Sequence, residues 1–308
     1  MRRAMILRSR WFLPLLLGSI VAAAGAAPAT DYATELAAWR KRAEENLRKD
    51  LGWLTIAGRW ELKEGDNTLG SNPANDIALP KELSPARLGV LRVGRDGARL
   101  TLEPGVRMWV EPEAGLRGPE FVQRALRTRD DAPEWVSSGR LSFYVFTRDD
   151  GKSILRIADR ESRNRRQFAG RVWYDPKAEM RLPARFVPYP AGTRIPVANV
   201  RGEITEEDAT GSVEFELAGQ KLKLDAFSED DGTLFIILRD GTSGVTTYPP
   251  GRFLRADKPV DGRTVLDFNK TYNPPCAFSA YTTCPLPPPQ NWLKSRIDAG
   301  EKYVAARK

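Results

Sequence analysis

The sequence contains no histidine among its 308 residues. Histidine is the commonest general base near neutral pH and a frequent metal ligand, so its absence excludes Ser-His and Cys-His nucleophile pairs and most zinc or iron sites. Glycine-rich phosphate loops and dinucleotide-binding fingerprints are also missing, which removes the usual signals of a nucleotide cofactor. We therefore expect no cofactor and no metal site.

Cysteine is almost as scarce, because Cys276 and Cys284 are the only two in the chain. Their spacing is not the Cys-x-x-Cys of redox enzymes, and two thiolates without histidine fill only half of a tetrahedral metal site. In an oxidising compartment the simplest expectation is a disulfide that closes a short loop and stabilises the fold by about 2.5 kcal/mol. Free structural thiols and functional thiols are the alternatives.

Long hydrophobic runs are missing too. The apolar stretch 11–24 is shorter than the roughly 20 residues that a membrane-spanning helix needs. Several arginines precede it and small residues follow at 25–29, which is the layout of a cleavable secretory signal. We expect a signal peptide at 1–27 and a periplasmic or secreted mature protein without a membrane span; an uncleaved membrane anchor is the alternative.

The basic excess of the chain depends on this segment. Residues 1–27 hold four of the 48 lysines and arginines and none of the 40 acidic residues, so cleavage would halve the formal charge of +8. Acidic and basic side chains are interspersed through the remainder, which is typical of a solvated surface. Nucleic acid is therefore not an expected partner.

A helix is expected at residues 28–52. Leu36, Trp39, Ala43, Leu47 and Leu51 recur at spacings of three and four, and a glycine at position 52 suits the end of a helix. The outer side of this segment is charged. The apolar stripe predicts a face that packs against a sheet.

Short β-like runs separated by turn residues follow the helix, and Asp-Gly and Gly-Asp pairs in the breaks favour hairpins. The expected strands lie at 54–62, 87–93, 99–102, 106–110, 141–147, 152–157, 172–174, 201–204, 212–217, 221–226, 234–238 and 264–268, with a further short strand around 121–126. The predicted fold is mainly β, built of antiparallel sandwich or barrel-like units with a helix at the N-terminus and a short helix at the C-terminus.

We divide this β region into an N-terminal unit at 53–150 and a C-terminal unit at 151–308 that contains the looped cysteine motif. The proline-rich segment 183–196 is expected to be a break in regular structure that links two β units. A single continuous fold is the alternative.

The C-terminal third carries a specific resemblance. The segments 266–276, 284–291 and 299–302, with upstream blocks at 239–244, 247–248 and 251–254, resemble the signature of a bacterial family catalogued as domain of unknown function 1684. Residues 156, 159, 168–170 and 184–186 are similar to the central block of that family. The resemblance implies a fold and supplies no mechanism.

A second likeness lies at residues 65–79. This segment is similar to the opening of forkhead-associated domains, which are β-sandwiches that bind phosphothreonine. Ser71 replaces the arginine of that pattern, and the later histidine is absent. We therefore expect a glycine-rich hairpin followed by an Asx-type turn here.

The polar residues of the C-terminal motifs give two functional hypotheses. An exported binding protein would hold a polar or anionic small ligand, or an envelope component, and the expected ligand-binding residues are Arg239, Tyr248, Arg252, Asn269, Asn273 and Asn291. The alternative is a histidine-free hydrolase of an envelope glycan or ester, with catalytic residues drawn from Asp240, Asp267, Glu301 and Tyr248. A purely structural role for these residues also remains open.

The segment 156–171 is rich in arginine. Its six arginines could receive a carboxylate or phosphate through paired hydrogen bonds; they are Arg156, Arg160, Arg163, Arg165, Arg166 and Arg171. Asp159 and Glu161 lie among them and are expected to neutralise some of this charge.

Overall fold

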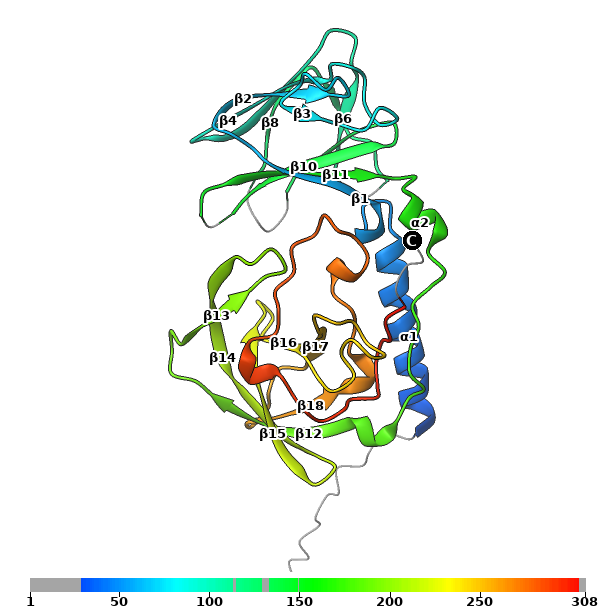
Figure 1. Ribbon diagram of the computed structural model, residues 1–308, viewed down its shortest axis with the longest axis vertical. Coiled ribbons are helices and arrows are strands. Elements are labelled where there is room, and N and C mark those ends of the chain that lie inside the picture. Colours follow the sequence, from blue (N-terminus) through cyan, green and yellow to red (C-terminus); the bar gives the residue numbers. More distant parts are fainter. Residues whose placement is uncertain (1–28, 113–114, 129–132, 149, 305–308) are drawn as a thin grey trace, which may run out of the picture.

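Figure 1 shows a computed structural model of the chain, which describes residues 29–112, 115–128, 133–148 and 150–304. The expected signal peptide at 1–27 lies outside the described residues. Two β units are stacked along the long axis of the molecule, and a long helix runs beside the second unit (Figure 1). The predicted, mainly antiparallel β fold is confirmed. In the described part of the chain, no helix has the length and apolar character needed to cross a bilayer.

The first unit contains a six-stranded sheet in the order β1-β11-β10-β9-β6-β7. Its strands are Ile56–Glu61 (β1), Met108–Glu111 (β6), Glu120–Phe121 (β7), Trp135–Ser138 (β9), Leu141–Thr147 (β10) and Ser153–Asp159 (β11). All residues of β11 are buried; Leu155 and Ile157 lie in the sandwich core, and Arg156 on the other face contacts the Trp53 ring.

A five-stranded sheet in the order β3-β2-β4-β5-β8 packs against the first one. It consists of Gly65–Gly70 (β2), Ile77–Ala78 (β3), Gly89–Gly94 (β4), Gly97–Leu102 (β5) and Gln123–Leu126 (β8). Leu91 and Leu100 from this sheet join Phe143 and Ile157 from the other in one apolar core. The first unit is therefore a β-sandwich.

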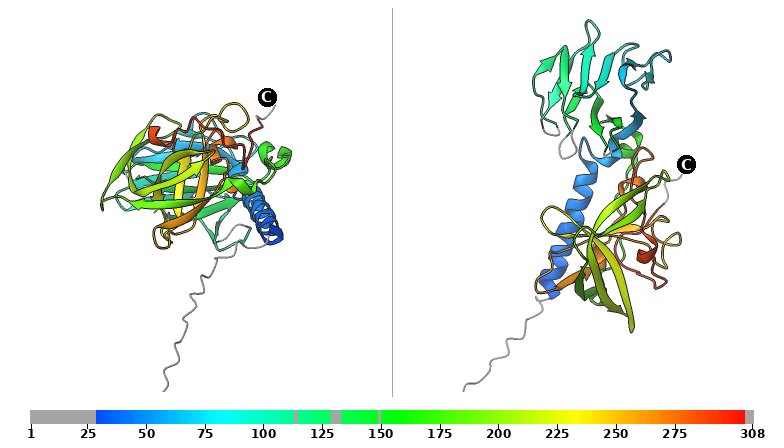
Figure 2. Two further views of the ribbon diagram at one scale, coloured as in Figure 1. Left: turned by 90° about the horizontal axis from the view of Figure 1, so that it is seen from below. Right: turned by 90° about the vertical axis from the view of Figure 1, so that its left-hand side faces the viewer.

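The second unit is built on a strongly curved sheet in the order β17-β16-β15-β14-β12-β18, with β13 paired to β14 (Figure 2). The strands are Arg181–Pro188 (β12), Arg194–Ala198 (β13), Ile204–Leu217 (β14), Gln220–Ser228 (β15), Leu234–Leu238 (β16), Arg252–Ala256 (β17) and Arg263–Asp267 (β18). One face carries the main core around Val213, Leu224, Ile236 and Phe268.

Four details of the predicted strand pattern are wrong. The segment 65–79, expected to be a glycine-rich hairpin, instead holds β2 and β3, which pair in parallel. The proline-rich segment 183–196, expected to be a break, contains most of β12 and the start of β13. The segments 201–204 and 212–217 are not two strands: the first is largely a turn, and the second lies inside the single long strand β14. Residues 172–174 form only an isolated bridge between Trp173 and Glu301.

The N-terminal helix spans Ala29–Arg48 (α1) and packs along the second unit (Figures 1 and 2). Leu36 and Leu47 of the apolar stripe are buried, and the Trp39 ring contacts Trp173 and Tyr272 edge to face. The stripe is a packing face, as predicted. The helix ends four residues before Gly52, whose N–H donates to the Lys49 carbonyl in the following turn.

Short helical turns make up the rest. They are Trp53–Thr55 (η1), Arg163–Gln167 (α2), Ala178–Met180 (η2), Phe268–Lys270 (η3), Pro275–Ala277 (η4) and Pro289–Asn291 (η5). The short helix expected near the C-terminus is thus represented by 3-10 turns. The division near residue 150 stays a prediction, although β11 extends the first sheet to Asp159.

Candidate functional site

A cavity of about 380 Å³ lies between α1 and the second unit, where Arg255 of β17 and the segment that follows β18 line it. The helix contributes Trp39 and Arg42, and η1 contributes Trp53. The second unit supplies the opposite wall from residues 171, 255, 270, 272, 273, 275 and 278. Segments more than 200 residues apart are brought together here, as the hydrogen bond from Tyr32 on α1 to Asp267 shows.

The charged side chains that line this cavity are all cationic. They are Arg42, Arg171, Arg255 and Lys270, and no carboxylate is among the lining residues. Acidic partners contact three of them: Glu301 pairs with Arg171, Glu229 with Arg255 and Glu35 with Lys270. Arg42 forms no ion pair with any residue that the structure describes. The cavity is therefore a positively charged environment.

Aromatic rings form the apolar part of the lining, from Trp39, Trp53, Tyr272 and Phe278. The Arg171 guanidinium carbon lies 5.0 Å from the centre of the Phe278 ring, and that of Arg255 lies 5.7 Å from the Tyr272 ring. Burial raises the pKa of the Tyr272 phenol to about 12. The phenol is therefore neutral at physiological pH and acts as an apolar surface with one polar end.

Arg171 is held by a buried carboxylate behind the cavity wall. Glu301 is 1% exposed, accepts from Arg171 and accepts from the Asn273 backbone N–H at 2.8 Å. Burial raises the pKa of the Glu301 carboxyl, against the lowering effect of Arg171. Gly300 has φ 77°, and a Cβ there would lie 2.5 Å from the Thr271 carbonyl oxygen, so only glycine lets the chain bring Glu301 to this position.

Asn273 is the predicted site residue that lines the cavity. Its amide nitrogen donates to the Lys302 carbonyl at 2.9 Å, which fixes the orientation of the side chain. Its Oδ1 and the Arg171 Nε are both buried and have no hydrogen-bond partner within the described chain. Unsatisfied buried polar atoms are uncommon in folded proteins, and two residues of this cavity lining each carry one.

Asp240 and Arg252 form a fully buried ion pair away from the cavity lining. The Arg252 Nη2 donates to Asp240 at 2.9 Å, and the guanidinium also donates to the carbonyls of Ile297, Ala299 and Glu301. The other Asp240 oxygen accepts from the Thr242 N–H at 2.8 Å. These contacts tie the C-terminal segment to the sheet.

Asp267 and Asn269 form hydrogen bonds with helix α1. Asp267 accepts from the Tyr32 hydroxyl of α1 at 2.9 Å, and Asn269 donates to the same hydroxyl at 3.0 Å. Asn269 also accepts from the Lys177 N–H and donates to the Lys177 carbonyl. Both predicted site residues therefore position α1 against the second unit.

Asn291 bridges two strands. Its Oδ1 accepts from the Asp225 N–H at 2.7 Å, and its Nδ2 donates to the carbonyls of Asp225 and Ile237 at 2.9 and 2.8 Å. Strands β15 and β16 pair directly only at Phe227–Phe235 and Ser228–Leu234. The Asn291 side chain replaces the backbone ladder where the strands separate.

Arg239 and Tyr248 lie in other surroundings. The Arg239 guanidinium carbon lies 5.2 Å from the centre of the Trp292 ring, and Tyr248 packs edge to face on Tyr303. Burial raises the pKa of Tyr248. Neither residue lines the cavity beside α1.

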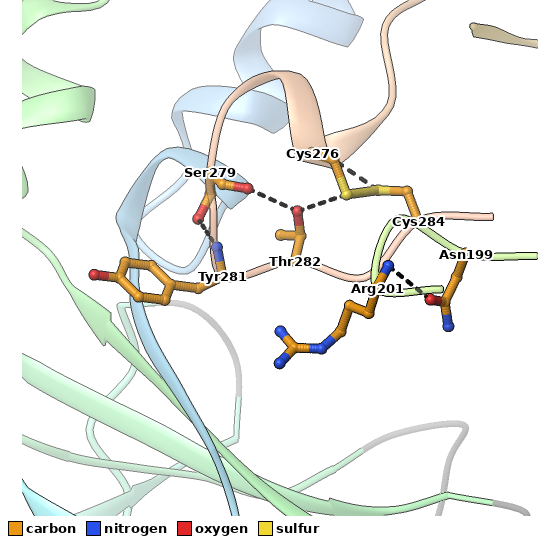
Figure 3. The surroundings of a disulfide bond; sticks show 7 residues. All are labelled: Asn199, Arg201, Cys276, Ser279, Tyr281, Thr282 and Cys284. Atoms are coloured by element: carbon orange, nitrogen blue, oxygen red, sulfur yellow. Dashed lines mark hydrogen bonds between the residues drawn. A yellow bond between two sulfur atoms is a disulfide. The ribbon is translucent and has the colours of Figure 1, made fainter. Parts of the chain in front are cut away.

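The expected disulfide joins Cys276 and Cys284, whose Cα atoms are 6.1 Å apart (Figure 3). Within the loop, Thr282 Oγ1 donates to the Cys276 sulfur and to the Ser279 carbonyl. The Ser279 hydroxyl donates to the Ile56 carbonyl of β1 at 3.2 Å. The disulfide loop therefore contacts the first unit, while Pro275 and Phe278 beside it line the cavity.

Sequence reasoning missed most of the cationic lining. Arg171 belongs to the arginine-rich segment, which predicts positive charge. Trp39 belongs to the apolar helix stripe, which predicts a packing face. Neither pattern predicts a cavity. Nothing in the order of residues placed Arg42, Arg255 or Lys270 around one cavity. Of the three candidate carboxylates, two form arginine ion pairs, the third binds Tyr32, and none lines this cavity.

The sequence model of a family described as protein of unknown function (DUF1684) matches residues 166–302. No curated protein matches the chain. One solved structure with a similar sequence is the solution NMR structure of an uncharacterized protein from gene locus rrnAC0354 of Haloarcula marismortui, which is 32% identical, with 45% of this chain and 78% of that chain covered and a TM-score of 0.38. The segment that matches this family model, residues 166–302, includes the wall of the cavity opposite α1.

Proposed function

We propose that this protein binds an anionic small molecule with an apolar or aromatic part, in the cavity between α1 and the second unit. The observation that carries the proposal is the lining itself: four cationic side chains and four aromatic rings, without a carboxylate, around about 380 Å³. Small-molecule sites have volumes of about 300–1,000 Å³ and combine apolar walls with a few polar groups.

The charges favour an anion. Glu35, Glu229 and Glu301 pair with their cationic partners but are not among the lining residues, so a ligand meets the guanidinium and ammonium groups directly. Arg42 has no acidic partner in the described part of the chain. Guanidinium groups bind carboxylate, sulfonate or phosphate oxygens through paired hydrogen bonds, which makes an oxyanion the best match.

The hydrolase alternative has no comparable support. It requires two carboxylates that face one cavity, with the pKa of one raised to serve as the acid. Asp240 and Glu301 instead form buried ion pairs with arginine, and the two Asp267 oxygens share the hydrogen bond that the Tyr32 hydroxyl donates. These contacts give each carboxylate a structural task.

We further propose that the mature protein is periplasmic or secreted. The basic, apolar and small-residue pattern of residues 1–27 supports export, and the Cys276–Cys284 disulfide is of the kind that persists in oxidising compartments. An envelope-derived acid is then an available ligand. Detection of mature protein that lacks the first 27 or so residues, by mass spectrometry of a periplasmic fraction, tests this part; a full-length cytosolic product contradicts it.

Anilinonaphthalene sulfonate tests the proposed ligand chemistry, because it is an aromatic anion whose fluorescence rises in apolar sites. We expect saturable binding to the folded protein and competition by benzoate. Benzamide, which lacks the charge, and acetate, which lacks the ring, should both compete much less well. Equal competition by benzamide would contradict the assigned charge preference.

A matched pair of helix variants locates the site. Arg42→Gln removes the unpaired cation of the cavity and should weaken probe binding by about threefold, a typical loss for one exposed charge contact. Lys41→Gln removes a neighbouring charge on the same helix that does not line the cavity and should leave the affinity unchanged. The same affinity in Arg42→Gln and Lys41→Gln would place the probe elsewhere.

A further inference from the structure

Two arginines lie directly opposite each other on the first sheet. Arg59 of β1 pairs in register with Arg156 of β11, and Tyr144 of β10 lies opposite Arg156 on the next strand. The three side chains therefore point to one face of the sheet. The opposite face carries Leu155 and Ile157 into the sandwich core, so this arginine face is the one turned to the second unit.

Few polar contacts offset the cost of burying the Arg156 charge. The residue is 8% exposed, and its one hydrogen bond to a described residue runs from Nη1 to the Tyr144 hydroxyl at 2.6 Å. Its guanidinium carbon lies 5.0 Å from the centre of the Phe146 ring and 5.6 Å from that of Trp53. Aromatic rings thus hold the guanidinium, while its Nε is buried without a partner.

Arg59 has still fewer contacts. Its Nε is also buried without a partner, and its side chain forms no hydrogen bond or ion pair with any of the residues that the structure describes. The residue is only half-buried, so its guanidinium can be reached from solvent. Burial, Arg201 and Arg156 all lower the pKa of Arg59, because each disfavours its charged form.

The nearby carboxylates are committed to other partners. Asp159 and Glu161, expected to neutralise the arginines around them, pair with Arg140. Glu203 is the carboxylate whose charge raises the pKa of Arg59. It pairs with Arg148 and accepts from the Asn199 amide at 2.9 Å. Arg201 comes from the turn beside Asn199, next to the disulfide loop (Figure 3), and adds another positive charge.

Such an arrangement is costly in an isolated protein. Like charges directly opposite each other across two strands are destabilising, and a buried charge without a partner costs more than an exposed one. Arginine does not escape the cost by losing its proton, because a guanidinium stays protonated throughout the physiological pH range. A bound anion removes both penalties at once.

We propose that Arg59 and Arg156 form an oxyanion site between the two units, which takes the carboxylate or phosphate group of a small molecule. The Nε atoms of both arginines lack a hydrogen-bond partner in the described chain, and guanidinium donors match the oxygens of such a group. The site goes beyond the proposed cavity ligand, since neither arginine lines the cavity beside α1. Because the arginine pair belongs to the first unit and Arg201 to the second, a bound anion also stabilises their contact.

Arg59→Gln tests the proposal against a matched control on the same unit. Arg99 of β5 also lies opposite an arginine, Arg92 of β4, but both are exposed, and Arg92 pairs with Asp66. Arg99→Gln therefore makes the same charge change in the same cross-strand geometry at an exposed position. Thermal unfolding of the wild type and both variants is measured in phosphate, acetate and chloride at one ionic strength.

Two results are expected. Without phosphate or acetate, Arg59→Gln should unfold at a higher temperature than the wild type, because it removes a repulsion that is not offset. Phosphate or acetate should then stabilise the wild type and Arg99→Gln more than Arg59→Gln, which keeps only the cavity beside α1. The anion that raises the unfolding temperature of the wild type more identifies phosphate or carboxylate as the preferred group.

Other outcomes overturn the site. Equal shifts in Arg59→Gln and Arg99→Gln would mean general screening, and no shift in the wild type would mean no binding. If Arg59→Gln does not fold, Arg59→Lys keeps the charge but loses the planar fork, and it should weaken anion binding by roughly tenfold. Arg42→Gln should lose only the part of the shift that comes from the cavity beside α1 and keep the part that Arg59→Gln loses, which separates the two sites.

Discussion

Replacement of Asn291 by alanine tests whether this predicted ligand residue is a structural bridge. The side chain is fully buried and makes three hydrogen bonds to backbone groups of Asp225 and Ile237. Each buried backbone group that loses its partner costs about 1–3 kcal/mol. A water molecule that enters the space can restore part of this loss. We therefore expect the free energy of unfolding to fall by about 3–5 kcal/mol.

Urea denaturation followed by tryptophan fluorescence measures this change, because Trp292 is the next residue in the chain. Asn75→Ala is the control: Asn75 is half-buried, and its hydrogen bonds to the carbonyls of Asn72 and Ala86 are exposed to water. Water replaces exposed hydrogen bonds, so this variant should lose less than about 1 kcal/mol. Similar losses in the two variants would refute the bridging role, as would a selective loss of ligand affinity at unchanged stability in Asn291→Ala.

The remaining predictions concern the disulfide and pH. Cys276→Ser combined with Cys284→Ser should lower the free energy of unfolding by about 2.5 kcal/mol on the loop-entropy estimate, and dithiothreitol should destabilise the wild type equally while leaving the double variant unchanged; an insensitive wild type would contradict the bridge. The pKa of Tyr272 is about 12 in the folded state, against about 10 in an unfolded chain. The stability that this protonated phenol contributes is therefore intact below about pH 10 and is lost as pH rises toward 12. Denaturation midpoints across that range should fall less steeply in Tyr272→Phe, and identical slopes would contradict the assignment.

Parts of the fold follow directly from the sequence. The apolar runs at Leu141–Thr147 and Leu234–Leu238 are predicted with the bounds that the structure shows. Both are rich in branched and aromatic side chains, and turn residues stand nearby. The apolar stripe of the N-terminal helix is also predicted from the sequence, because Leu36 and Leu47 recur at helical spacing and both are buried.

Strands β12 and β13 were not predicted, because both contain proline. Pro196 lies in β13, which pairs with β14 alone, so its missing N–H can face the unpaired side. Pro183 of β12 pairs with Val265 of β18 but lies just before the pairing with β14 begins at Ala184. Proline is tolerated at such edges, and only the observed pairing reveals that these positions are edges.

The candidate site was the harder prediction for a different reason. A motif identifies polar residues but not the direction of their side chains. Asn269 and Asn291 bind backbone groups inside the second unit, whereas Asn273 reaches the cavity. The cavity also needs α1, whose Tyr32 lies 235 residues from its partner Asp267. Contacts over such a separation leave no periodic signal in a single sequence.

The most direct test of the central claim is a crystal structure of the protein soaked with anilinonaphthalene sulfonate. Our account predicts electron density for the probe in the cavity beside α1, with the sulfonate contacting Arg42, Arg171 or Lys270 and the rings against the aromatic lining. Density for the probe at another surface, with that cavity unchanged, would contradict the proposed binding function.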